Sequence, residues 1–236
     1  MNLNGATALV TGANRGIGAH LAAQLLERGA KVYATARRPE LLDLPGAEVL
    51  ALDVTDPAAI EAAARQAGDV DLLINNAGIA SGATLLGDLD RVHTEMAVNV
   101  WGPLAMVRAF APVLAANGGG AVVNVASAAS WLALPGATAY AMTKAAVWSM
   151  SNGLRHELAA QGTQVTSVHI GIADTDMTAG QDLPKADPAD IARATLDGVE
   201  AGEFEVVTDD LAALAKTLLA GDPRESYATV ARMLSA

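Results

Sequence analysis

The sequence has no cysteine among its 236 residues, which excludes disulfides, thiolate nucleophiles and cysteine-ligated metals. Its histidines are scattered too widely to predict a metal site; they are His20, His93, His156 and His169. The first residues lack the basic stretch of a secretory signal, and the apolar run 105–116 is interrupted by Arg108 and Pro112 and too short to cross a bilayer. We therefore expect a cytoplasmic protein with no metal and no membrane partner.

Basic residues are also scarce. The chain has 15 Lys and Arg against 26 Asp and Glu, a net charge of −11, whereas binding a phosphate backbone needs a basic surface. Nucleic acid is therefore not an expected partner. The basic residues are unevenly spread, because residues 1–40 contain five Lys and Arg and only two acids. This local excess indicates an anion-binding segment, with chance in a small sample as the alternative.

Short apolar runs alternate along the chain with longer amphipathic segments, and 52% of the residues are hydrophobic. The expected strands are 6–10, 31–36, 48–53, 72–75, 121–126, 165–170 and 204–208. The expected helices are 16–28, 57–66, 91–116, 138–161, 188–201, 211–219 and 223–234. This alternation is typical of a parallel sheet with helices on both faces, and no linker or repeat divides it. We therefore predict one doubly wound α/β domain over residues 1–236.

A glycine-rich turn follows the first expected strand and opens the first expected helix, in the order Thr-Gly-Ala-Asn-Arg-Gly-Ile-Gly from Thr11. Glycines in this context permit a sharp turn and a close approach of backbone to a pyrophosphate, while the helix N-terminus offers free N–H groups. The turn predicts a dinucleotide site, with a ligand-free tight turn as the alternative. The residues expected at the cofactor here are Gly12, Asn14, Arg15, Gly16, Ile17 and Gly18.

The residues after the second expected strand bear on which dinucleotide is bound. Folds that prefer NAD commonly place an acidic residue there for the ribose 2′-hydroxyl, whereas this chain has Arg37 and Arg38. Arginine suits bidentate phosphate binding, and Arg15 could reach the same 2′-phosphate. The pattern favours NADP(H) over NAD(H), with a solvated loop face as the alternative for Arg37 and Arg38.

A proton-transfer group is indicated by Tyr140 and Lys144, which stand one turn apart on an expected helix, and by Ser127 upstream. Reducing a carbonyl by hydride transfer requires a proton donor. The reference pKa of tyrosine is about 10, and a nearby ammonium and an oxidised nicotinamide both lower it. Lys144 could also hold the nicotinamide ribose, and Ser127 would bind the substrate oxygen. Separately, the three residues could be a core aromatic, a solvated lysine and a turn serine.

Together with Asn75-Asn76-Ala77-Gly78 and Asn99, these motifs resemble the short-chain dehydrogenase/reductases in order and spacing over the first three-quarters of the chain. The resemblance implies a Rossmann-type sheet of about seven parallel strands, a nicotinamide cofactor and a homotetramer or homodimer. It also implies cofactor contacts at Asp53, Val54, Asn75, Ala77, Gly78, Tyr140, Lys144, Gly171 and Thr175. It assigns Asn99 to the catalytic set, as the residue that kinks its helix and holds a water for a proton relay. The family usually has proline at position 170, where this chain has isoleucine, which predicts a less rigid turn.

The expected substrate pocket is apolar. Its expected lining is Ile79, Ala80, Ala128, Ala129, Trp131, Leu132, Ile172, Ala173 and Met177. None of these side chains is a cation for an anionic substrate, so a neutral, largely apolar ketone or aldehyde is expected, with a substrate lid near 177–187. For Trp131, capping the substrate and packing in the core remain equally open. The segment beyond Asp209 carries no motif, and an interface helix is one interpretation.

The expected function is that of an NADPH-dependent oxidoreductase that reduces such a carbonyl reversibly to an alcohol. The alternatives are an NAD-linked alcohol dehydrogenase of the same family and a non-catalytic dinucleotide-sensing protein.

Overall fold

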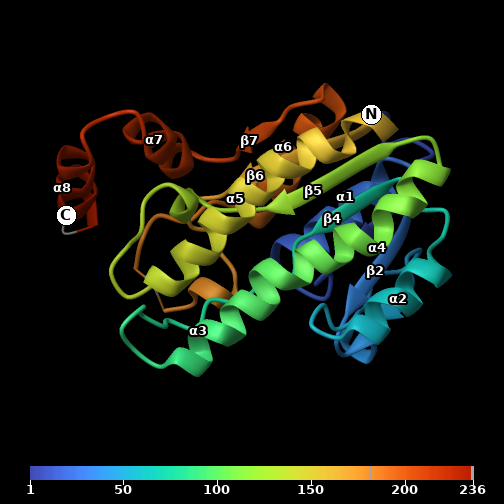
Figure 1. The fold of residues 1–236 in the computed structure, drawn as a ribbon, viewed down its shortest axis with the longest axis horizontal. Helices are drawn as coiled ribbons and strands as arrows, with labels where there is room; N and C mark the ends of the chain where they lie inside the picture. The colour runs from blue at the N-terminus through green and yellow to red at the C-terminus, as the bar shows by residue number, and fades with distance from the viewer. Residues whose placement is uncertain (181, 235–236) are drawn as a thin grey trace.

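A computed structural model describes residues 1–180 and 182–234, and its centre is a parallel sheet of seven strands (Figure 1). Their order in the sheet is β3-β2-β1-β4-β5-β6-β7, and every neighbouring pair is parallel. The strands are β1 (Thr7–Val10), β2 (Lys31–Ala36), β3 (Glu48–Ala51), β4 (Leu72–Asn75), β5 (Gly120–Val125), β6 (Thr163–His169) and β7 (Glu205–Val207). The predicted Rossmann-type α/β fold is confirmed.

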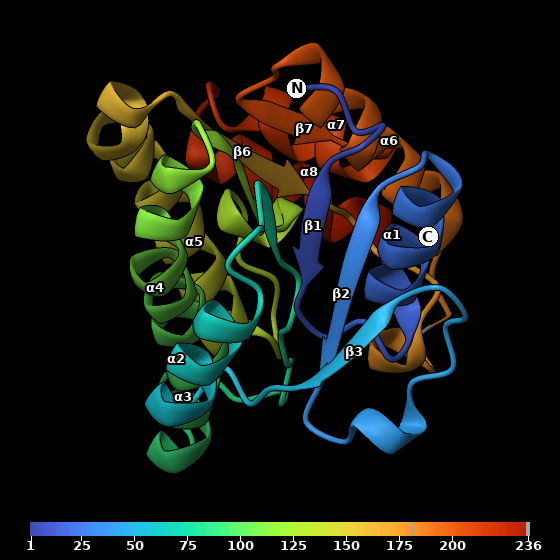
Figure 2. The same cartoon turned by 90° about the vertical axis from the view of Figure 1, so that its right-hand side faces the viewer.

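Helices cover both faces of this sheet: α2, α4 and α5 lie on one side, and α1 and α6 on the other (Figure 2). The helices are α1 (Gly16–Glu27), α2 (Pro57–Gln66), α3 (Leu89–Met96), α4 (Gly102–Ala116), α5 (Thr138–Leu158), α6 (Pro188–Ala201), α7 (Asp210–Leu218) and α8 (Pro223–Leu234). Short 3-10 turns span Pro39–Leu41, Ala128–Ser130, Ala159–Gln161 and Asp176–Thr178. Asp56 and Asp187 cap α2 and α6 by accepting backbone N–H bonds, each before a proline at the first helical position.

Two hydrophobic cores form because successive strand residues point to opposite faces of the sheet. In β1, Val10 belongs to the core under α1 and α6, whereas Leu9 belongs to the core under α2 and α4. Phe110 of α4 is fully buried in the second core. Burying a side chain of this kind contributes about 1.5–3 kcal/mol. The two cores hold the carboxyl ends of the strands along one edge of the sheet.

The predicted single helix over 91–116 is divided in the structure. It begins at Leu89, where the Asp88 side chain caps its first turn, and a π-helical turn over Ala97–Trp101 separates α3 from α4. Gly102 follows this turn, and a Cβ there would lie 2.9 Å from Cγ2 of Val54. Single π-helical turns are frequent at functional sites. This one places Asn99 at the sheet edge.

By length and composition the 28-residue stretch Leu89–Ala116 could cross a membrane. In this fold it instead packs as a core helix, because Met106, Phe110 and Leu114 are fully buried against the sheet and α2. The C-terminal segment likewise packs within the chain. Ala212 and Ala215 of α7 share a cluster with Trp131 and Leu132, while α8 lies at one end of the molecule (Figure 1).

Candidate active site

A cleft of about 810 Å³ runs along the carboxyl ends of the strands. This volume is in the upper part of the range for ligand pockets, and crevices at this edge are the usual binding sites of open α/β sheets. The predicted residues that line it are Gly12, Asn14, Arg15, Gly16, Ile17, Gly18, Arg37, Asp53, Val54, Ala77, Gly78, Ile79, Ala80, Ser127, Ala128, Ala129, Tyr140, Lys144, Gly171, Ile172, Ala173, Thr175 and Met177. The topology thus brings most of the predicted residues together. The predicted residues that do not line it are Arg38, Asn75, Asn99, Trp131 and Leu132.

The glycine-rich turn is shaped to receive phosphate. Gly12 and Gly16 have φ angles of 67° and 55°, a left-handed conformation that favours glycine. A Cβ on Gly18 would lie 2.3 Å from the Gly12 carbonyl oxygen, so α1 packs against the turn too closely for any other residue. No side chain caps α1 and no acidic residue stands in its first turn. Its free N–H groups and positive helix end therefore face the cleft.

Asn76, rather than Asn75, is the strand-four asparagine at the cleft. Its Nδ2 donates to the Thr11 and Gly12 carbonyl oxygens at 2.9 and 3.2 Å, which fastens the glycine-rich turn to the end of β4. Asn75 lies beneath the cleft and donates to Asn124 Oδ1 at 2.9 Å. Those two asparagines are in register on adjacent strands, so their side chains pair inside the sheet. The Asn75 side chain is thus turned away from the cleft, and the predicted contact of Asn75 with the cofactor stays a prediction.

The basic residues near the 2′-phosphate position differ in their surroundings. Both Arg37 and Arg38 are exposed, but Arg37 lines the cleft and Arg38 does not, in agreement with the alternative of a solvated residue for Arg38. Arg15 pairs at 2.8 Å with Asp176, and both side chains are about 70% exposed, so this ion pair is worth little. Burial raises the pKa of Asp53, but hydrogen bonds from Thr55 and the charge of Arg37 outweigh this and lower it overall. The carboxylate of Asp53 is therefore fixed beside Arg37.

Two segments carry the predicted proton-transfer group, namely the end of β5 and helix α5. Ser127 follows β5, and its hydroxyl donates to the Ile170 carbonyl at 3.1 Å and accepts the Ala129 N–H at 3.1 Å. Tyr140 and Lys144 lie on α5, with Lys144 Nζ 5.5 Å from the centre of the Tyr140 ring. Lys144 is buried and donates to the Val125 carbonyl at 2.7 Å. All three side chains face the cleft.

Burial dominates the titration of this group. It raises the pKa of Tyr140 to about 12, an effect that the Ser127 hydroxyl opposes and the charge of Glu95 reinforces. Burial also lowers the pKa of Lys144 to about 8. Burial therefore moves the two pKa values apart and favours the neutral phenol. Positive charge from a bound oxidised nicotinamide would lower the pKa of the phenol and so make its proton easier to transfer.

Asn99 is buried in the π-helical turn, and its side chain is fully engaged. Its Oδ1 accepts the Ile79 N–H at 2.9 Å, while Nδ2 donates to the Ile79 carbonyl at 2.9 Å and to Thr143 Oγ1 at 3.0 Å. The side chain therefore holds the loop after β4 against α5 and does not reach the cleft. Its predicted part in a proton relay stays a prediction.

The turn after β6 is held by hydrogen bonds where the resemblance would place a proline. The Ile170 carbonyl accepts the Ala128 N–H at 2.8 Å, and the Gly171 N–H donates to Asp209 Oδ2 at 2.8 Å. A Cβ on Gly171 would meet Asp209 Oδ1 at 2.3 Å and Leu211 Cβ at 2.9 Å. The N-terminus of α7 therefore holds this turn from outside the sheet, and the predicted loss of rigidity stays a prediction.

Trp131 packs in the core instead of lining the substrate pocket. Its ring stacks on His169 with the centroids 4.0 Å apart and the planes 13° apart, and Trp148 meets it edge-on. His169 contacts the Ser127 carbonyl with Nδ1 at 3.3 Å, and burial lowers its pKa to about 4, so it is neutral near pH 7. Of the two interpretations of Trp131, the structure supports packing. Leu132 lies in the same cluster.

Several cleft residues escaped the sequence analysis. They include Leu134, Pro135 and Leu211, together with Asn76, which holds the glycine-rich turn. Leu183 also lines the cleft and lies within the predicted lid. The signal for Asn76 was present in its place beside a strand end. Leu211 had no local signal, because it reaches the cleft only through the packing of α7. The predicted lid is a loop closed at its base by the Ala186 N–H bond to Ile172 at 2.7 Å; position 181 within it lies outside the described residues.

Known proteins share this architecture. The family model for short chain dehydrogenases matches residues 6–185. A short chain dehydrogenase from Burkholderia cenocepacia, crystallised in complex with NADP, is 39% identical and covers 97% of this chain and 98% of its own, with a TM-score of 0.92. A short chain dehydrogenase/reductase from Burkholderia phymatum in complex with NAD is 26% identical, with a TM-score of 0.81 over 92% of this chain and 93% of its own.

A curated relative is also similar along the whole chain. The 3-oxoacyl-(acyl-carrier-protein) reductase of Vibrio harveyi is 34% identical over 100% of this chain and 92% of its own length. The family model, these relatives and the geometry of the cleft agree. The chain therefore belongs to the short-chain dehydrogenase/reductase family and is an oxidoreductase.

Proposed function

We propose that the protein is an NADPH-dependent carbonyl reductase that converts a neutral, largely apolar ketone or aldehyde into an alcohol and catalyses the reverse oxidation. The observation that carries the proposal is a single cleft in which an uncapped helix N-terminus and Arg37 stand at one end and Ser127, Tyr140 and Lys144 at the other. An anion site joined to a proton-transfer group suits a dinucleotide beside a reacting carbonyl.

The residues present fit a nicotinamide dinucleotide. The turn excludes a Cβ at Gly18 where a pyrophosphate would approach, and the α1 N–H groups have no capping side chain. Arg37 forms no hydrogen bond or salt bridge within the described part of the chain, so its guanidinium is available to a 2′-phosphate. The bound cofactor would supply or accept the hydride, and Lys144 would hold its ribose hydroxyls.

The roles of the catalytic residues follow from their placement. Ser127 would bind the carbonyl oxygen and stabilise the negative charge that develops on it during reduction. Tyr140 would give its phenolic proton to that oxygen, and in the reverse reaction its phenolate would take the proton from the alcohol. The Lys144 ammonium favours the phenolate, which keeps proton transfer possible in both directions.

The substrate end of the cleft supports an apolar substrate. Its walls include Ile79, Leu134, Ile172, Leu183 and Leu211. The cations that line the cleft are Arg15, Arg37 and Lys144, and all three lie at the proposed cofactor position or beside Tyr140. An anionic substrate group would therefore be desolvated without a partner, which is costly. We propose that the loop over 177–187 covers this end as a lid.

The cofactor preference rests on Arg37 and on the absence of an acidic residue directly after β2. Relatives of both kinds exist, because the Burkholderia cenocepacia enzyme was crystallised with NADP and the Burkholderia phymatum enzyme with NAD. Of these two enzymes, the one from Burkholderia phymatum has the cofactor that the alternative function, an NAD-linked alcohol dehydrogenase, would use. The arginine at the strand end favours NADP(H) for this chain.

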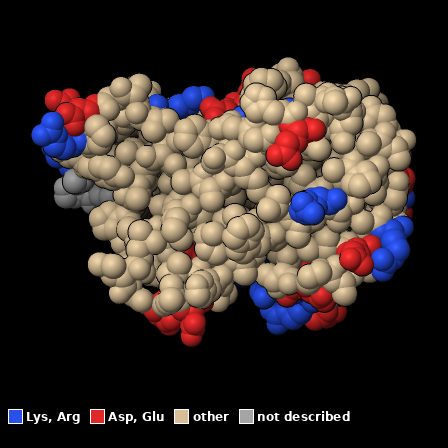
Figure 3. Space-filling model, in the orientation of Figure 1, with Lys and Arg blue, Asp and Glu red and all other residues tan. Residues whose placement is uncertain are grey.

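We also propose that the protein acts in the cytoplasm as a homodimer or homotetramer. The face covered by α4 and α5 shows few charged side chains (Figure 3), although the chain carries a net charge of −11. Trp101, between α3 and α4, is 58% exposed. An uncharged face with an exposed tryptophan is a suitable contact for a second copy.

The function is tested with the Tyr140→Phe variant and a panel of ketones, aldehydes, alcohols and one 3-oxoacyl thioester, assayed by absorbance with NADPH, NADH, NADP⁺ and NAD⁺. We expect turnover of apolar ketones with NADPH and a loss of about 10²–10⁴-fold in Tyr140→Phe, because the variant lacks the general acid. NADPH binding should be retained in the variant.

Other results would contradict the proposal. Full activity in Tyr140→Phe would refute the mechanism. NADPH binding without turnover of any panel member would support the dinucleotide sensor, and a preference for the thioester would assign the protein to acyl reduction.

A further inference from the structure

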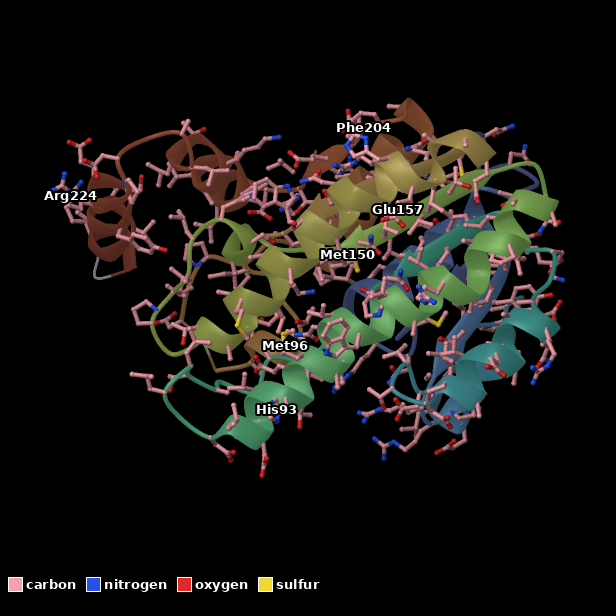
Figure 4. All side chains as sticks on the ribbon, in the orientation of Figure 1. His93, Met96, Met150, Glu157, Phe204 and Arg224 are labelled. Atoms are coloured by element: carbon pink, nitrogen blue, oxygen red, sulfur yellow. The ribbon has the colours of Figure 1, made fainter. Side chains whose placement is uncertain are left out.

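Side chains on one face of α3 and of the π-helical turn form hydrogen bonds with the loop that follows β4. Arg91 and Glu95 of α3 and Asn99 of the π-helical turn stand at four-residue intervals, on the helix that carries the labels His93 and Met96 in Figure 4. Asn99 binds both backbone groups of Ile79, as described above. The next two side chains on the face contact Ser81.

Glu95 makes the principal contact with Ser81. Its Oε1 accepts the Ser81 N–H at 2.5 Å and the Ser81 hydroxyl at 2.6 Å. Arg91 donates to the Ser81 carbonyl. The three side chains thus bind residues on both sides of Ala80, so the segment 79–81 is held at each end. Ile79 and Ala80 both line the cleft.

Glutamate is an unusual residue for binding the Ser81 N–H and hydroxyl at a buried position. Its side chain is completely buried, and its second oxygen, Oε2, has no hydrogen-bond partner among the described residues. A buried carboxylate with one unsatisfied oxygen costs free energy, and a neutral side chain could accept the same two bonds from Ser81. Holding the loop over 79–81 therefore does not by itself explain why a carboxylate, and not a neutral side chain, stands at position 95.

The neighbouring helix offers an explanation. α3 packs against α5, which carries Tyr140. The groups that act on the titration of Tyr140 are Lys144, whose Nζ lies 5.5 Å from the ring centre, the Ser127 hydroxyl after β5, and the charge of Glu95 on α3. His169, which is neutral, lies behind Ser127. Among them Glu95 is the acidic one. Its charge raises the pKa of Tyr140 and so opposes the effect of the Lys144 ammonium.

We propose that Glu95 is a positioning residue for the reaction: it fixes the Ile79–Ala80 wall of the substrate pocket through Ser81, and its buried charge adds to the burial that disfavours the Tyr140 phenolate. The inference rests on the proposed carbonyl reductase function. The buried charge extends reduction to higher pH, because a protonated phenol donates to a carbonyl, whereas oxidation needs the phenolate to accept the proton of the alcohol.

The test compares Glu95→Gln with Ser81→Ala and with Asp90→Asn, which removes an exposed charge from the same helix. Ketone KM, NADPH affinity and the pH profile of alcohol oxidation are measured for each. In Glu95→Gln we expect the rising limb of oxidation to move about half a pH unit or more to lower pH, because the phenol loses a nearby negative charge. Asp90→Asn should leave the limb in place.

Ser81→Ala separates the two roles. It should raise the ketone KM about fivefold by loosening the wall, with NADPH affinity and the pH limb unchanged. An unmoved limb in Glu95→Gln, or an equal movement in Asp90→Asn, would overturn the electrostatic role. An unchanged KM in Ser81→Ala would overturn the role in the wall.

A readout without turnover keeps the inference separate from the proposed function. The chain has three tyrosines, so the phenolate absorbance of Tyr140 is the difference between the titration curves of the protein and its Tyr140→Phe variant. The same difference measured on the Glu95→Gln background should show a lower midpoint. If no ketone is reduced, the proposed function fails while this titration still decides the role of Glu95; an unchanged midpoint refutes that role. Retained NADPH binding shows that each variant is folded.

Discussion

At the scale of single residues, the two arginines after β2 differ only in where the fold places them. Arg37 lines the cleft beside Asp53, whereas its neighbour Arg38 is exposed outside it. Both side chains are exposed, although only one of the two lines the cleft. A charge change at the two positions therefore tests the cofactor site with a matched control.

We predict that Arg37→Asp lowers the NADPH to NADH ratio of kcat/KM by about 100-fold, because it removes a charge-assisted bond to the 2′-phosphate and adds repulsion. Arg38→Asp should change the ratio by less than about threefold, since exposed charges are screened. Steady-state kinetics with both cofactors measure the effect. Equal changes in the two variants would show that Arg37 does not read the phosphate.

At the scale of elements, the close packing between the turn after β1 and helix α1 requires a residue without a side chain at position 18. Gly18 is packed so that a Cβ would approach the Gly12 carbonyl oxygen to 2.3 Å and Asn76 Nδ2 to 2.5 Å. Backbone must move to relieve the first of these contacts. By contrast, Gly153 in the interior of α5 has nothing within 4 Å of its Cβ position. The two glycines serve as a matched pair.

Gly18→Ala should lower the free energy of unfolding by about 2–3 kcal/mol through overpacking. It should also weaken NADPH binding at least about tenfold, because the turn that approaches the phosphates is displaced. Gly153→Ala should instead stabilise the protein by about 0.5–1 kcal/mol, since glycine is unfavourable in a helix interior. Urea unfolding and cofactor titration provide the measurements. Normal affinity in Gly18→Ala would remove the turn from the cofactor site.

At the scale of the whole molecule, the cleft joins segments that are distant in sequence. Its walls run from Gly12 in the first turn to Leu211 in α7, and Asp209 ties α7 to Gly171 at the end of β6. A ligand in the cleft therefore contacts residues from many segments of the chain, and almost none of these contacts exist when the chain unfolds. Binding should stabilise the native state as a whole.

We predict that NADPH at about 100 times its Kd adds about 2.7 kcal/mol to the free energy of unfolding. For a chain of this size that is a rise of about 5–10 °C in Tm. NADH at the same concentration should give a distinctly smaller rise, because it lacks the 2′-phosphate. Thermal unfolding followed by tryptophan fluorescence measures both. Equal rises with the two cofactors would contradict the proposed preference for NADP(H).

Much of this arrangement could be read from local sequence. The apolar periodicity gave all seven strands within a few residues, and the glycine-rich turn and the Tyr140–Lys144 spacing located both ends of the cleft. These features depend on short-range geometry, namely strand alternation, helical spacing and glycine at positive φ. Such geometry is a property of a few neighbouring residues.

The tertiary structure alone decided which side chains lie at the cleft where this depends on packing between elements that are distant in sequence. The register of β4 with β5 pairs Asn75 with Asn124 and leaves Asn76 at the cleft. The stacking of Trp131 on His169 removes the tryptophan from the pocket, and the docking of α7 supplies Leu211 in its stead.

The sequence by itself determined the order of strands and helices, the glycine-rich turn and the Tyr140–Lys144 spacing, because each depends on short stretches of chain. The tertiary structure decided which residues line the cleft, and it buried Glu95 against Ser81 on a helix that packs against α5. The physical reason is that burial, and the charge interactions that burial strengthens, arise only when helices and strands far apart in sequence exclude water between them.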